Sequence, residues 1–257
     1  MRTRAYFLLA MLLVAHSAQA ANSDLTTTWR IQPTEPRTGE QTVRPGDVLW
    51  EQPLLPATIV ALTADALATS GGKPVFPAGT QLMEMDAGSA AVFCDFNPRK
   101  AGFAEQMLIG KVGETATCLI DADKDGHFDG FFTKKVQYEG FPIIRGGYPD
   151  APKPLAPVAY AKISGAAASA SYYVGLRYTG RGLFGDKLNF QVVFGGPKSK
   201  GALSDLFSIV GTSMPMTVEV VGAHITVLAA DGGMLHYRID STMSAQDFSV
   251  RRTYIIR

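Results

Sequence analysis

The sequence predicts an all-β fold, in which mostly antiparallel strands form a β-sandwich or two small packed β modules with little helix. The main observation is that apolar and polar side chains alternate over many short stretches, as half-buried strands require. In SYYVGLRYTG, for example, Val174, Leu176 and Tyr178 fall on one face. Turn residues such as the Asp-Gly-Gly at 231–233 separate these stretches. No long stretch has a helical period.

Residues 1–20 are the first element and have the three-part layout of a secretory signal peptide. Two arginines precede an apolar run from Ala5 to Ala15, and Ala18-Gln19-Ala20 matches an A-x-A cleavage site. The run is too short for a transmembrane anchor, because a spanning helix needs roughly 20 apolar residues. We therefore expect a periplasmic or secreted protein with a cleaved signal peptide of the Gram-negative type.

The charge balance of the expected mature chain restricts its partners. Cleavage removes two arginines and leaves 22 basic and 23 acidic side chains, a net charge of −1. Such a balance gives no electrostatic basis for binding nucleic acid. No later apolar run reaches membrane length, so we expect no transmembrane segment in the mature chain. The expected partner is an envelope or extracellular component whose identity the sequence leaves open.

Residues 21–140 are expected to contain a flexible, polar N-terminal segment at 21–40 and an N-terminal β unit at 41–140. This unit holds both cysteines of the chain, Cys94 and Cys118. An even number of cysteines in an exported protein predicts a disulfide between them. Two buried thiols or a catalytic cysteine are the alternatives, and nothing else in the sequence supports either.

The most distinctive motif of the N-terminal unit is DADKDGHFD, residues 121–129. Its first six residues match D-x-D-x-D-G, the densest part of a calcium-binding loop. The candidate metal ligands are four aspartate side chains and one backbone carbonyl, namely Asp121, Asp123, Asp125, Asp129 and the carbonyl of His127. The expected ion is Ca²⁺, which takes six to eight oxygen ligands and would relieve the repulsion among these carboxylates.

Two features of this stretch depart from the loop of an EF-hand. Position twelve is Phe132 rather than a bidentate glutamate, so two oxygens are missing unless a distant acid supplies them. The flanking residues favour strands rather than helices. The loop resembles the looser calcium loops of dockerin modules and other extracellular proteins, over residues 121–129 only. The alternative is an acidic turn that joins two strands without a metal.

The remaining elements are a Pro/Gly-rich connector at 141–157 and a C-terminal antiparallel β unit at 158–257. Proline removes backbone donors and stiffens the chain, so residues 141–157 suit a connector better than a strand. The C-terminal unit contains most of the alternating stretches. The pattern leaves open whether the two units form one sandwich or two domains.

No motif in the sequence identifies a catalytic chemistry. The patterns H-E-x-x-H, G-x-S-x-G and the phosphate-binding loop are absent. We therefore expect a non-catalytic protein with a binding or cell-envelope structural role. The alternative is a hydrolase of an envelope polymer that uses the carboxylates of the 121–129 loop as general acid or base. An outer-membrane β-barrel fits less well, because the expected strands are short for spanning.

Overall fold

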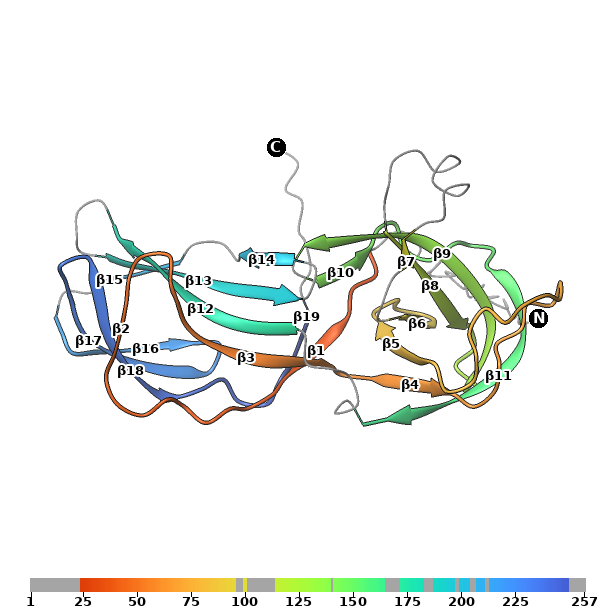
Figure 1. The fold of residues 1–257 in the computed structure, drawn as a ribbon, viewed down its shortest axis with the longest axis horizontal. Helices are drawn as coiled ribbons and strands as arrows, with labels where there is room; N and C mark the ends of the chain where they lie inside the picture. The colour runs from red at the N-terminus through yellow and green to blue at the C-terminus, as the bar shows by residue number, and fades with distance from the viewer. Residues whose placement is uncertain are drawn as a thin grey trace, which may run out of the picture.

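The fold is all-β, as the alternation predicted (Figure 1). The computed structural model describes residues 24–95, 99–100, 114–139, 141–164, 172–182, 187–196, 199–203, 207–210 and 213–249. Within these ranges there is no helix, and the strand pairings are antiparallel. The predicted signal peptide, residues 1–20, lies outside the described residues. Along the ranges described, no apolar helix of membrane-spanning length is formed.

Six strands close a β-barrel at one end of the elongated molecule (Figure 1). Their order is β9-β11-β4-β5-β6-β8, and the ring closes because β9 pairs with both β11 and β8. The barrel strands are β4 (Ile59–Leu62), β5 (Gln81–Met85), β6 (Ala91–Asp95), β8 (Glu114–Asp121), β9 (His127–Glu139) and β11 (Lys153–Ile163). Two short strands extend it, β10 (Phe141–Ile144) beside β9 and β7 (Arg99–Lys100) beside β8.

Alternation along these strands sorts their side chains between the barrel interior and its outer surface. One apolar cluster receives side chains from all six strands and therefore fills the interior. Its members include Val60, Leu82, Phe93, Leu119, Phe128 and Val158. A second cluster lies outside the barrel, on the opposite face of four of these strands, β5, β6, β8 and β9. It includes Met83, Cys94, Cys118, Phe132 and, from outside the ring, Leu25 and Ile144.

The predicted disulfide between Cys94 and Cys118 is confirmed, with an S–S distance of 2.05 Å. The two cysteines are direct cross-strand partners on β6 and β8. Both are buried in the outer cluster. Stable disulfides are typical of oxidising compartments, so this one indicates a non-cytoplasmic environment.

Two further sheets make up the other end of the molecule and share one apolar core. The first sheet contains β1 (Thr28–Ile31), β3 (Val48–Pro56), β12 (Tyr172–Arg181), β13 (Lys187–Gly196), β14 (Ser199–Leu203), β15 (Phe207–Val210) and β19 (Asp247–Ser249). The second contains β2 (Gln41–Val43), β16 (Met216–Val220), β17 (Ala223–Asp231) and β18 (Met234–Ser241). Their common core includes Trp29, Leu176, Phe190, Ile225 and Tyr237.

The strand pairings interleave distant parts of the chain. Strand β3 pairs with β12 and then leads into β4 of the barrel, so the chain passes between the two ends at residues 57–58 (Figure 1). Residues 21–40, expected as a flexible segment, include β1, whose Trp29 is buried. Residues 141–157, expected as a connector, include β10 and the start of β11.

Candidate metal centre

The aspartate motif forms the turn between β8 and β9, at one mouth of the barrel. Asp121 ends β8 and pairs with Ala91 of β6, which packs against the interior cluster, so the Asp121 side chain points inward. Residues 122–126 reverse the chain. Lys124 and Gly126 have positive φ angles of 62° and 91°. Glycine adopts such a conformation without the steric cost that other residues meet, which explains the glycine at this place in the turn.

Asp121 is fully buried at the base of the turn. Its Oδ1 accepts a hydrogen bond from the backbone N–H of Asp125 at 3.1 Å. Its Oδ2 accepts from the N–H of Gly126 at 3.0 Å and from the hydroxyl of Tyr160 at 2.8 Å. A buried carboxylate needs such donors. Because a carboxylate offers about four acceptor positions, these three bonds leave roughly one for another partner.

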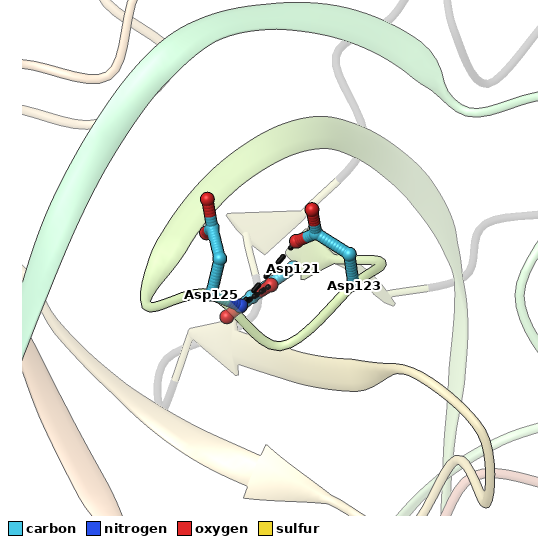
Figure 2. A group of neighbouring side chains, drawn as sticks. All are labelled: Asp121, Asp123 and Asp125. Carbon is cyan, nitrogen blue, oxygen red and sulfur yellow. Dashed lines mark hydrogen bonds between the residues drawn. The ribbon is translucent and has the colours of Figure 1, made fainter.

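Asp123 and Asp125 lie above Asp121 on the exposed part of the turn (Figure 2). Asp123 Oδ1 accepts from the N–H of Asp125 at 3.3 Å, and Asp125 Oδ1 accepts from the N–H of His127 at 2.8 Å. One oxygen from each of the three carboxylates lies within 4.8 Å of the other two. The three side chains therefore form a group that could hold a metal ion.

The remaining predicted ligands are placed differently. Asp129 is exposed on β9, between two buried neighbours, and is not part of the group of three. The ring Nδ1 of His127 lies 3.3 Å from Asp125 Oδ1. A contribution from the His127 carbonyl stays a prediction. Phe132, at position twelve, is buried in the outer cluster and offers no ligand oxygen.

Tyr160 of β11 is a residue of the site that sequence reasoning missed. Its ring stacks on Phe128 inside the barrel, with the ring centroids 4.3 Å apart, while its hydroxyl donates to Asp121. Burial, and after it the hydrogen bond and charge of Asp121, raise the pKa of Tyr160 above its ordinary value of 10.0. Since the folded-state pKa is the higher one, the stabilisation is fully present below about pH 10 and is lost progressively as the pH rises from there through the folded-state pKa.

Lys124 links the aspartate turn to the neighbouring turn at the barrel mouth. Its Nζ donates to the backbone carbonyl of Gly88, in the turn between β5 and β6, at 3.3 Å. The aspartate turn is thus held from below by Asp121 and from the side by Lys124. A turn that is already ordered loses less conformational entropy when it binds an ion.

Tyr160→Phe removes the hydroxyl donor while keeping the stacked ring. We expect it to lower the free energy of unfolding by about 2 kcal/mol, since the lost hydrogen bond has a charged acceptor. Urea denaturation measures the change. Tyr148→Phe is the matched control, because its hydroxyl bonds to Ser89 at an exposed position. Equal effects of the two substitutions would contradict the importance assigned to the Tyr160–Asp121 bond.

The chemistry of the site is that of an oxygen-only ligand set. Both cysteines are in the disulfide, and the group of three contains carboxylates alone. Hard cations such as Ca²⁺ and Mg²⁺ prefer such ligands. Comparison of the chain with protein-family models, with curated proteins and with solved structures finds no match.

Proposed function

We propose that this chain is a non-catalytic, secreted or periplasmic protein with a binding or cell-envelope structural role, and that its aspartate turn holds a structural Ca²⁺. The observation that carries this proposal is the gathering of three carboxylates on one turn, those of the buried Asp121 and the exposed Asp123 and Asp125. The disulfide supports the proposed location. Cys118 lies three residues before Asp121 on β8, so the bridge to β6 also restrains the strand that enters the turn.

Ca²⁺ is favoured over Mg²⁺ because the turn supplies few oxygens in an irregular arrangement. Ca²⁺ accepts six to eight oxygens at about 2.3–2.6 Å in flexible geometry, whereas Mg²⁺ demands a near-ideal octahedron at about 2.0–2.1 Å. Water would complete the shell around the three aspartates. With so few protein ligands, we expect a dissociation constant of roughly 0.1–1 mM, the range of extracellular calcium modules.

A structural role is favoured over acid–base catalysis by the same carboxylates. Glycoside hydrolysis uses two carboxyl groups that flank the scissile bond, about 5–9.5 Å apart. Here one oxygen of each aspartate lies within 4.8 Å of the others, on a single turn. Three donors already occupy most of the Asp121 carboxylate. This arrangement supports the binding of a cation between the carboxylates more than that of a polymer chain.

Thermal unfolding with and without calcium tests the proposal. Calcium at tenfold the dissociation constant should stabilise the fold by about 1.4 kcal/mol relative to EDTA. For a chain of this size, that corresponds to a rise in melting temperature of roughly 3–6 °C. Magnesium should give a smaller rise.

Two substitutions provide the comparison. Asp123→Asn should abolish the calcium-dependent rise, because it removes one of the three charges of the group. Asp129→Asn is the matched control from the same hairpin and should preserve the rise. A melting temperature that calcium leaves unchanged would overturn the proposal. If the stability does not depend on calcium and Asp123→Asn removes turnover of an envelope polymer, the hydrolase alternative is favoured instead.

A further inference from the structure

The barrel mouth beside the aspartate turn opens into a cavity of about 270 Å³. Its wall comes from β5, β6 and β11 of the barrel, from the turn between β5 and β6, and from the aspartate turn. Its lining residues include Glu84, Phe93, Lys124, Tyr160 and Lys162. Mouths of β-barrels are recurrent places for small-molecule sites.

Two charged side chains occupy inward positions of the barrel at this mouth. Lys162 is the cross-strand partner of Val60, which is part of the interior cluster. Glu84 is the cross-strand partner of Phe93, another member of that cluster. Cross-strand partners point to the same face of a sheet, so both charged side chains point toward the barrel axis. The inward-pointing side chains farther from the mouth are mostly apolar.

No partner neutralises these two charges within the part of the chain that the structure describes. Across the described ranges, neither Glu84 nor Lys162 has a side-chain hydrogen bond or an ion pair, and both are exposed to the cavity. The other polar side chains of the wall belong to Asp86, Lys124 and Tyr160, and each of these residues has an interaction partner. Lys124 donates to Gly88, and the hydroxyl of Tyr160 donates to Asp121.

Part of the same wall is aromatic. The rings of Phe93 and Tyr160 lie 5.2 Å apart, centroid to centroid, and both line the cavity. Aromatic side chains provide a rigid apolar surface for the non-polar part of a ligand. The cavity volume lies just below the roughly 300–1,000 Å³ of drug-sized sites, so it suits a ligand of few atoms.

We infer that this cavity binds a small zwitterion of the size of a free α-amino acid. The carboxylate of Glu84 receives the ligand's ammonium group, and the ammonium group of Lys162 receives its carboxylate. A ligand with one charge would leave the other of these two side chains without a partner. The site does not require the metal, because neither Glu84 nor Lys162 belongs to the group of three aspartates.

The test is an NMR titration of the isotope-labelled chain with each of the standard amino acids. We expect at least one to bind saturably at or below about 10 mM, the range of weak small-ligand affinities. The best ligand is then compared with its decarboxylated amine and its deaminated acid. Each analogue should bind at least tenfold more weakly.

Substitutions of residues that line the cavity test whether the ligand binds there. Glu84→Gln and Lys162→Gln should each weaken the best ligand about tenfold, or about 1.4 kcal/mol. Glu219→Gln and Lys73→Gln are the controls, because both residues are exposed and lie outside the cavity wall. Asp123→Asn should leave amino-acid binding unchanged, which separates this inference from the metal proposal. Absence of saturable binding would overturn the inference. Analogues that bind as tightly as the best amino acid would also overturn it, as would Glu84→Gln and Lys162→Gln variants that bind this amino acid as tightly as the native chain.

Discussion

Replacement of Asp121 by alanine is expected to lower the free energy of unfolding by about 4 kcal/mol in EDTA. The substitution removes an acceptor from three donors, namely the N–H groups of Asp125 and Gly126 and the hydroxyl of Tyr160. The Asp125 N–H keeps its longer bond to Asp123 Oδ1 at 3.3 Å, so the larger loss falls on the other two donors. Each unsatisfied buried donor costs roughly 1–3 kcal/mol, and water that enters the opened turn recovers a part of this. Asp121→Asn keeps one oxygen acceptor and should cost about half as much.

Urea denaturation in EDTA measures this effect without any contribution from a bound ion. Asp129→Ala is the matched control, because Asp129 is exposed on the same hairpin. It should change the free energy of unfolding by no more than about 0.5 kcal/mol. An Asp121→Ala variant as stable as the control would contradict the role of Asp121 as the anchor of the turn.

Loss of the disulfide is expected to have the second largest effect. The bridge joins residues 24 positions apart, and closing a loop of that length stabilises the fold by about 3 kcal/mol on the chain-entropy model. The double substitution Cys94→Ala/Cys118→Ala should therefore lower the melting temperature by roughly 6–12 °C. Substituting both cysteines avoids an unpaired thiol in the outer cluster.

Calorimetry of the double variant provides the measurement, and the native chain with a reductant provides the control. Both samples should melt at the lower temperature. A double variant with the same melting temperature as the oxidised native chain would contradict a stabilising role for this bridge.

The alternating pattern identified the buried face of single strands, because burial of one face follows from the local sequence alone. Val174, Leu176 and Tyr178 were expected on one face of a strand, and all three are buried in the core of the two facing sheets. Closure of the barrel was not predicted. It depends on the pairing of β4 with β11, which joins residues far apart in the chain, such as Leu62 and Tyr160.

The same distinction between local and distant contacts explains what was predicted of the site. Asp121, Asp123 and Asp125 come together because they alternate within one turn. Asp129 lies beyond that turn, where the strand directs its side chain outward. Tyr160 reaches Asp121 from 39 residues away. Shortly before Tyr160, the register of β11 against β9 shifts between Pro154 and Val158. Sequence spacing alone could therefore not have indicated the contact between Tyr160 and Asp121.

The most direct test of the proposed metal site is a calcium titration followed by the backbone amide NMR signals of residues 121–127. We expect one saturable event with a dissociation constant of roughly 0.1–1 mM. The shifts should be largest in this turn and absent from the Asp123→Asn variant, while Asp129→Asn should titrate like the native chain. Amide signals in the turn that stay unchanged up to about 10 mM calcium, or identical titration of the Asp123→Asn variant, would contradict the assignment of a calcium site.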